Sequence, residues 1–357
     1  MRTIQYALIA THEPSEQIEW CLYHLRRAAP DAVIVYPILL PERTDVLVSL
    51  PTGLQRVSVP VAEELLVQVA RGLRQALQTG ATRRALGHAT RLYDWLIRPL
   101  EPILAAVPVQ TLVFVPDGVL RTIPMAALYD GTQFLVRKYA LATTPGLTLT
   151  DPRPLPRGHG HMLAVGVANA VQGFPALPYV ARELRAVHQI YGGKLLLNED
   201  FQLTRLEQTL QQEAFSMMHI ASHGQFASDA AQSFILTFED RLTMPQLEQL
   251  IGGLQRRTTP LELLTLSACE TALGDDRAAL GLAGIAIKAG ARSAVATLWR
   301  VQDEAAALLV TEFYRHLQDP TVSRAVALQR AQLALLDDPR YQDPFFWSPF
   351  LLLNNWL

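Results

Sequence analysis

The pattern of apolar and polar positions changes about halfway along the chain. In the first part, three short apolar runs follow one another closely and predict an antiparallel meander of strands at 33–40, 45–50 and 54–61. Apolar residues at helical spacing then predict two amphipathic helices, at 62–77 and 82–100. This part ends with a buried strand at 110–116 and a hairpin at 129–144, which turns through Asp130 and Gly131.

Strands and helices alternate regularly in the second part. Strands are expected at 161–168, 194–200, 217–224, 234–238, 261–271 and 291–299. Helices are expected at 179–192, 204–214, 244–253, 280–290, 303–317 and 323–336. Such alternation predicts an α/β fold, in which a mostly parallel sheet carries helices on both faces.

Two of these helices have recognisable start signals. Thr204 and Glu207 have the spacing of a capping box, in which each side chain bonds the backbone N–H of the other residue. Thr243 is the expected N-cap of the helix at 244–253, with Pro245 in its first turn.

The change of pattern divides the chain into three parts. Three prolines and two glycines between 151 and 160 predict a boundary there. We therefore expect a helical lead-in at 1–32, which contains an amphipathic helix at 16–29, an accessory α+β subdomain at 33–155 and a second subdomain at 156–357. No 34-residue period that would indicate tetratricopeptide repeats is present.

Composition and charge narrow the class of protein. Half of the 357 residues are hydrophobic, so the chain has ample material for a large core. Lys and Arg number 31 against 33 Asp and Glu, a balance that argues against direct binding of nucleic acid or of an anionic membrane. Only two cysteines occur and the N-terminus is a poor signal peptide, so we expect a soluble, cytoplasmic protein without disulfides.

Two residues that could carry chemistry stand where apolar strands end. His223 closes the run MMHIASHG, and Cys269 lies near the end of LELLTLSACET. If the two strands are parallel neighbours, both side chains emerge at the same edge of the sheet, where open α/β proteins place their sites. A thiol needs a base to become a thiolate at neutral pH, so the pair predicts a nucleophile with its base. The backbone N–H groups of Gly224 and Cys269 could form an oxyanion hole.

Other kinds of site are not supported by the sequence. His219 lies on the same strand face as His223. We interpret it as a buried residue that packs behind the site and takes no direct part in the reaction. No metal is expected, because the remaining histidines lack Cys or carboxylate neighbours at ligand spacing. No GxSxG elbow and no Walker-type GK[ST] loop occurs, and no cofactor is expected.

Five segments resemble the motifs of the CHAT family, caspase-like cysteine peptidases related to separase. They are FVPDGVLRTIPMAAL at 114–128, HIASHG at 219–224, LSACET at 266–271, GARSAVATLWRVQDEAA at 290–306 and DPFFWSPFLLL at 343–353. The resemblance implies a caspase-like fold for 156–357 and an accessory or degenerate caspase-like subdomain at 33–155. It also implies cleavage of proteins or peptides, often under control of an activating partner or of tetratricopeptide repeats fused to the chain.

The same resemblance gives Asp303 a place in the substrate pocket, and Glu270 is a candidate because it follows Cys269 directly. The segment LWRVQD is similar to the separase segment whose aspartate receives the basic residue before the cleaved bond. Asp303 could equally be the N-cap of the helix at 303–317, and the two interpretations stay open. Glu270 either shapes the pocket or orients the turn that carries Cys269.

These observations predict a thiol endopeptidase that uses the dyad His223 and Cys269, and the resemblance implies that it cleaves after a basic residue. Two other hypotheses stay open. The chain could be a catalytically silent caspase-like scaffold for protein binding, or a cysteine hydrolase or transferase that acts on something other than peptides. Neither the substrate protein nor the trigger of activity follows from the sequence.

Overall fold

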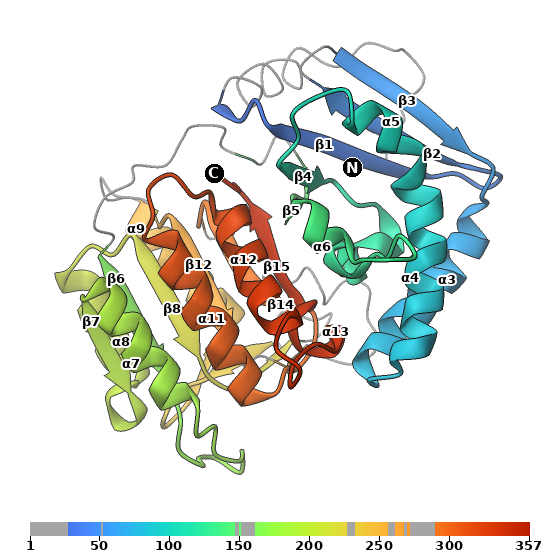
Figure 1. Cartoon of the computed structure of the whole chain (residues 1–357). Coiled ribbons are helices and arrows are strands. Elements are labelled where there is room, and N and C mark those ends of the chain that lie inside the picture. The colour runs from blue at the N-terminus through green and yellow to red at the C-terminus, as the bar shows by residue number, and fades with distance from the viewer. Residues whose placement is uncertain are drawn as a thin grey trace.

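A single sheet runs through the whole molecule (Figure 1). The computed structural model describes residues 28–50, 53–146, 150, 161–226, 233–255, 261–267, 270–271 and 290–357. Within these ranges eleven strands follow the order β3-β2-β1-β4-β5-β15-β14-β12-β8-β6-β7. The predicted helix at 280–290, nearly all of the one at 16–29 and the boundary at 151–160 lie outside the described residues.

The first half of the sheet begins with the predicted meander. Strands β1 (Ala32–Leu39), β2 (Thr44–Leu50) and β3 (Gly53–Val59) pair antiparallel, as their spacing indicates. Strand β4 (Thr111–Phe114) pairs parallel with β1. Helices α3 (Glu63–Gln78) and α4 (Thr82–Leu96) match the two predicted amphipathic helices, and α5 (Glu101–Leu104) follows a 3₁₀ turn at Arg98–Leu100.

The predicted hairpin at 129–144 forms only at its turn. Strand β5 (Ala140–Thr143) pairs parallel with β4, and the short helix α6 (Leu135–Lys138) precedes it. The Asp130 carboxylate accepts hydrogen bonds from the backbone N–H groups of Thr132 and Gln133. These bonds close the turn, and Tyr129 and Phe134 form an isolated antiparallel bridge across it, but α6 follows at once and the pairing extends no further.

The second half is the predicted alternation of strands and helices. Strands β6 (Met162–Gly166), β7 (Lys194–Leu197), β8 (Met217–Ala221), β12 (Leu263–Ser267) and β14 (Ser293–Thr297) are parallel to one another. The helices of this half are α7 (Val180–Tyr191), α8 (Leu203–Gln212), α9 (Met244–Gln255), α11 (Asp303–Leu317), α12 (Arg324–Leu336) and α13 (Pro344–Trp347).

Alternate residues of the strands face two separate hydrophobic layers. In β8, Met218 and Ile220 belong to one layer, together with apolar residues of α8 and α9. Met217 and Ala221 face the opposite layer, which α7, α11 and α12 cover (Figure 1). Because both faces are buried, these strands appear in the sequence as continuous apolar runs, as is typical of parallel sheets.

A smaller sheet lies at the edge where β8 and β12 end. It has the order β11-β10-β9-β13, formed by β9 (Gly224–Phe226), β10 (Phe234–Leu236), β11 (Arg241–Thr243) and β13 (Glu270–Thr271). Strands β9 and β13 of this sheet follow β8 and β12 in the chain, and each begins directly after a position of the candidate dyad.

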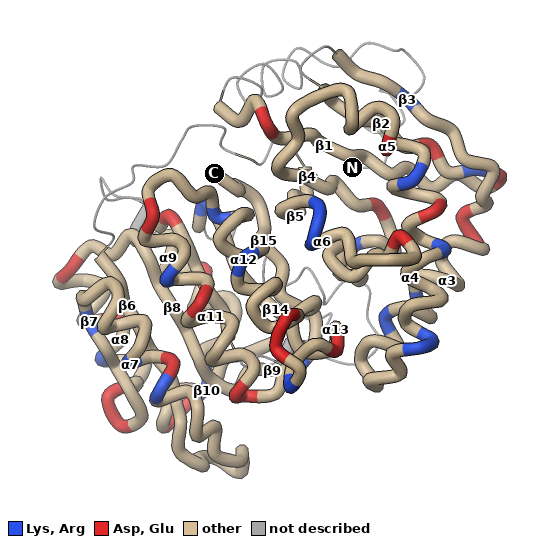
Figure 2. The backbone as a smooth tube through the Cα atoms, viewed as in Figure 1, with Lys and Arg blue, Asp and Glu red and all other residues tan. Residues whose placement is uncertain are grey.

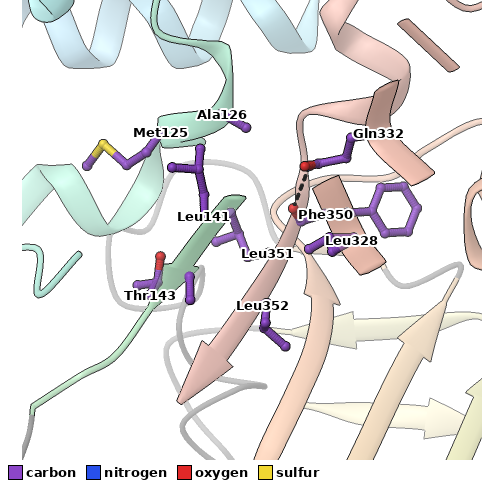
Figure 3. Close-up of a pocket in the computed structure, with 10 residues that line it drawn as sticks. Met125, Ala126, Leu141, Thr143, Leu328, Gln332, Phe350, Leu351 and Leu352 are labelled. Atoms are coloured by element: carbon purple, nitrogen blue, oxygen red, sulfur yellow. Dashed lines mark hydrogen bonds between the residues drawn. The ribbon is translucent and has the colours of Figure 1, made fainter. Parts of the chain in front are cut away.

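Strand β15 (Phe350–Asn354) joins the two halves at the middle of the large sheet. It is antiparallel to β14, whereas its pairing with β5 is parallel and consists of the single register pair Leu353 and Thr143. A cavity of about 10 Å³ opens beside this short contact (Figure 3). Such a volume holds at most one water molecule, so the cavity is a packing defect at the junction and not a ligand site.

The two predicted helix starts have different outcomes. Helix α8 begins at Leu203 after the N-cap Gln202, with no side-chain cap, so the capping box at Thr204 and Glu207 is wrong. Helix α9 begins directly after Thr243, as predicted, and the Thr243 N–H and hydroxyl both donate to Oε1 of Gln246.

Charged residues of both signs are interspersed along the described backbone (Figure 2). This distribution agrees with the nearly balanced total of 31 basic and 33 acidic residues. Among the described residues, no helix is both long and apolar enough to cross a membrane.

Candidate active site

The strands that carry the predicted dyad are parallel neighbours, as expected. Strands β8 and β12 pair in register from Met217 and Leu263 to Ala221 and Ser267. His223 follows β8 by two residues. Cys269 lies outside the described residues, and so does Cys21.

The pairing resumes beyond the dyad positions. Gln225 in β9 is in register with Glu270 in β13, again in the parallel sense. The two chain segments are therefore paired on the near side, at Ala221 and Ser267, and on the far side, at Gln225 and Glu270. His223 and Cys269 fall between these two points of registration in the sequence.

The imidazole of His223 is buried and oriented by a backbone carbonyl. Its exposed fraction is 7%. Nε2 lies 2.8 Å from the carbonyl oxygen of Pro175, and a carbonyl can only accept, so Nε2–H donates. In the neutral ring this leaves the lone pair on Nδ1. The ring of Phe174 packs beside the imidazole, with 5.2 Å between the ring centroids.

No feature of the sequence indicates this orienting group. Any residue at position 175 presents a carbonyl oxygen, so no residue type marks its use. Pro175 also lies 48 positions before His223, within a loop that has no periodic pattern. Only the three-dimensional path of the chain brings them together.

The backbone of His223 is fixed by strand β10. The Leu236 N–H donates to the carbonyl oxygen of His223 at 2.8 Å. The Ser222 hydroxyl in turn donates to the carbonyl oxygen of Leu236 at 2.7 Å. Gly224, the predicted oxyanion residue, begins β9 and is paired with Ile235 of β10.

His219 lies in a buried polar cluster beneath the sheet. Its Nε2 is 2.7 Å from Oε1 of Glu183 in α7, and both side chains are fully buried. The Tyr314 hydroxyl of α11 lies 3.4 Å from Nδ1 of His219 and donates to Thr265 of β12 at 2.8 Å. Burial raises the pKa of Tyr314, which keeps the hydroxyl protonated. The cluster ties two helices to the two dyad strands.

Glu183 was not among the predicted site residues. A glutamate in an amphipathic helix is ordinarily solvent-exposed, because its charge is costly to bury. The signal in the sequence is its position: it lies on the same helical face as Val180, Leu184 and Val187, which are all buried.

Asp303 connects the starts of two helices. It is the first residue of α11, whose N-cap is Gln302, so the interpretation of Asp303 as the N-cap is wrong. Its Oδ2 accepts a hydrogen bond of 2.7 Å from the N–H of Tyr179, at the start of α7. Oδ1 is buried and has no hydrogen-bond partner among the described residues.

The electrostatic environment of Asp303 favours the protonated form. Burial raises the pKa of the carboxyl group above 3.8, and the nearby carboxylate of Glu183 raises it further. The N–H of Tyr179 acts in the opposite direction without cancelling the shift. A buried acid with an unsatisfied oxygen is suited to receive a cation or a hydrogen-bond donor.

Other predicted positions are described only in part. Glu270 is placed by its backbone in β13, and its side chain is outside the description. No group of three or more His, Cys, Asp or Glu residues within the described ranges could hold a metal ion.

A comparison with protein families identifies the family of the chain. Residues 86–355, about three quarters of the chain, match the CHAT domain family. The chain belongs to the CHAT family. Among curated proteins, no sequence matches it.

Solved structures of very low sequence identity share the fold of this CHAT chain. Separase from Saccharomyces cerevisiae, in two structures of its complex with securin, gives TM-scores of 0.65 and 0.56 at 9% identity, over 95% of this chain. The Arg-specific cysteine proteinase gingipain R gives a TM-score of 0.50 at 9% identity, over 81% of this chain and 74% of its own. The fold is therefore the caspase-like fold of these cysteine peptidases. The chain spans about a third of the length of the separase chain.

Proposed function

We propose that this chain is a cysteine endopeptidase in which His223 and Cys269 form the catalytic dyad. The main support is the register of the two strands: β8 pairs with β12 before the dyad positions, and β9 pairs with β13 after them. Chain segments that are paired on both sides of two residues keep those residues close. The caspase-like fold adds support, since separase and gingipain R use the same architecture.

The proposed reaction begins with a proton transfer from the Cys269 thiol to Nδ1 of His223. The thiolate then attacks the peptide carbonyl carbon, and a C–S bond forms as the C=O bond becomes a C–O⁻ bond. Next, the imidazolium gives its proton to the departing amine while the C–N bond breaks. A water molecule, activated by the same imidazole, finally hydrolyses the thioester and restores the thiol.

The Pro175 carbonyl assists the proton transfer. Its hydrogen bond with Nε2–H keeps the lone pair on Nδ1 and stabilises the imidazolium, whose N–H groups are stronger donors. Positioned general-base catalysis of this kind contributes a factor of about 10² to 10⁴. The N–H groups of Gly224 and Cys269 would stabilise the oxyanion.

Asp303 is proposed to bind a basic side chain on the amino side of the cleaved bond. Its Oδ1 is buried without a partner among the described residues, and an Arg or Lys side chain would supply the missing donor. The Arg specificity of gingipain R is in line with this proposal. Glu270 would orient the turn at Cys269 or contribute to the pocket, and His219 would support the dyad from within the core.

The test uses fluorogenic peptides that differ only in the residue before the reporter bond. Arg and Lys peptides should be cleaved, and Cys269→Ala and His223→Ala should each lose about 10² or more of the rate. Cys21→Ala is the matched control and should keep full activity. An assay in extract, with new protein termini identified by mass spectrometry, includes any activating partner. Identical termini with wild-type protein and Cys269→Ala would exclude peptidase function.

A binding scaffold is the second candidate, because His223 is only 7% exposed and packs against Phe174. In a silent scaffold, Cys269 would behave as an ordinary thiol. The two functions are separated by iodoacetamide at neutral pH. With a working dyad, iodoacetamide alkylates Cys269 much faster than Cys21, whereas in a scaffold the two cysteines react at similar rates. The presence of only two cysteines fits a cytoplasmic setting for either function.

A further inference from the structure

The loop at 167–179, between β6 and α7, provides two neighbours of the His223 ring. The Pro175 carbonyl accepts from Nε2–H at 2.8 Å, and the Phe174 ring lies beside the imidazole. Beyond two local turns, the loop has no regular structure of its own. The position of the base therefore depends on what holds this loop in place.

The tip of the loop is a tight turn centred on Gln172 and Gly173. Their φ angles are 52° and 83°, and the Phe174 N–H donates to the carbonyl oxygen of Val171 at 2.9 Å. A positive φ is ordinary for glycine but unfavourable for glutamine. The conformation at Gln172 therefore needs an external contact to maintain it.

The Gln172 side chain makes that contact. Its Nε2 group lies 3.0 Å from the carbonyl oxygen of Thr237, and 3.3 Å from those of Phe238 and Asp240. These three carbonyls belong to the turn between β10 and β11. One amide group thus fastens the tip of the loop to this turn, immediately before Phe174 and Pro175.

The β10–β11 turn is a firm anchor because it is closed internally and joined to the dyad strand. The Thr237 N–H donates to the carbonyl oxygen of Asp240 at 2.9 Å, and the Thr237 hydroxyl donates to the same oxygen. One residue earlier, the Leu236 N–H holds the carbonyl oxygen of His223. The same hairpin therefore fixes the backbone of the base and, through Gln172, the partner of its ring.

We propose that Gln172 is a positioning residue for the dyad: its amide holds the 167–179 loop against the β10–β11 turn, so that the Pro175 carbonyl stays aligned with Nε2–H of His223. This inference rests on the proposed function, and it concerns the base alone. Gln172 itself touches neither substrate nor the reacting atoms. Its effect on the reaction passes through Pro175 to the imidazole.

Removing the amide should change the rate and not the binding of substrate. With Gln172→Ala, kcat for an Arg peptide should fall about tenfold, while KM stays within about a factor of two. Gln172→Glu keeps the shape but turns a carboxylate oxygen towards three carbonyl oxygens, so its loss should be at least as large. Gln202→Ala is the matched control: the Gln202 amide donates to Glu239 in the same turn, and not to the loop. It should leave kcat unchanged.

A second readout follows the base directly and does not depend on peptide cleavage. The rate of Cys269 alkylation by iodoacetamide is measured against pH, with the modified residue identified by mass spectrometry. A weaker Pro175 bond stabilises the imidazolium less, so the thiolate should form at higher pH in Gln172→Ala, by about half a unit or more. Gln202→Ala should follow the wild-type curve. Circular dichroism establishes that each variant is folded.

The outcomes separate this inference from the proposed function. A shifted alkylation curve in Gln172→Ala supports the inference, even if no peptide is cleaved and the peptidase proposal fails. Wild-type kcat together with an unshifted alkylation curve in Gln172→Ala overturns it, even if the wild-type protein is an active peptidase. If Cys269 of the wild-type protein is alkylated with the same pH dependence as a free thiol, both the inference and the proposed function are overturned.

Discussion

Glu183 of α7 and His219 of β8 form a fully buried pair, with 2.7 Å between Oε1 and Nε2. Tyr314 of α11 reaches the other ring nitrogen of His219. The pair therefore stands where two helices meet the strand that leads to His223. The second carboxylate oxygen of Glu183 has no hydrogen-bond partner among the described residues, so the cluster is held by few contacts, each of which matters.

Glu183→Ala should destabilise the protein by about 3–5 kcal/mol, because it leaves His219 buried without its acidic partner. The free energy of unfolding in urea measures this cost. Glu312→Ala is the matched control: Glu312 lies in helix α11 and pairs at the surface with Arg315. Its cost should stay within about 1 kcal/mol. Equal unfolding midpoints for the two variants would show that the buried pair stabilises the protein no more than the surface pair does.

Gly166→Ala should disturb the end of β6 beside the dyad strand. A Cβ atom at this position would lie 2.0 Å from the carbonyl oxygen of Ala221, and backbone must move to admit it. We expect a loss of about 3 kcal/mol in stability and a lower melting temperature. Gly87→Ala, in open space on α4, should instead gain about 0.5–1 kcal/mol from the higher helix propensity of alanine. A neutral Gly166→Ala would mean that β6 and β8 are less closely joined than the structure shows.

Asp303→Asn should alter how stability depends on pH. The pKa of Asp303 is raised above 3.8 by burial, so above that pH the folded protein retains a proton that the unfolded chain releases. Stability therefore falls as pH rises from 3.8 through the raised pKa. Asparagine keeps an acceptor for the Tyr179 N–H but cannot ionise. The stability of the variant relative to wild type should grow over this range in urea titrations, while cleavage after Arg or Lys is lost. A pH-independent difference would contradict the assignment.

Asp130→Asn should have the opposite pH dependence. Burial alone would raise the pKa of Asp130, but hydrogen bonds from Lys138, Thr132 and Gln133 hold it below 3.8. A lowered pKa contributes stability that is present above 3.8 and is lost as pH falls through the folded value. The variant should therefore be less stable than wild type at pH 7, and the gap should close in acid. Lys138→Met removes the strongest partner of the Asp130 carboxylate. In the Lys138→Met background, Asp130→Asn should therefore cost less stability at pH 7 than it does in the wild-type protein.

The strands were the most predictable part of the fold. Those of the second half are buried on both faces, so each appears as an apolar run, and the helices between them predict parallel order. The parallel pairing of β8 and β12 followed from this reasoning. The hairpin at 129–144 was predicted correctly only at its aspartate–glycine turn, where Tyr129 and Phe134 form an isolated antiparallel bridge. The turn residues do not determine how far the pairing extends, and in this chain helix α6 begins at Leu135.

From the sequence, the candidate site could be proposed only from residue types with recognisable chemistry. His223 and Cys269 are conspicuous in the sequence near the ends of apolar runs, whereas the group that orients His223 is a main-chain oxygen that any residue at position 175 would provide. Asp303 and Tyr179 are 124 positions apart, and their contact depends on how α7 and α11 pack. Glutamate is usually exposed to solvent, and the burial of Glu183 is explained only by its partner His219.

The central position of β15 sets an order of events for the nascent chain. All the other described strands are made before β15, and yet it lies between β5 and β14. Until residues 350–354 leave the ribosome, both of those strands expose open edges that could pair with other polypeptides. The two halves of the sheet can join only after β15 has been made, so we expect earlier folding intermediates to aggregate through these two edges.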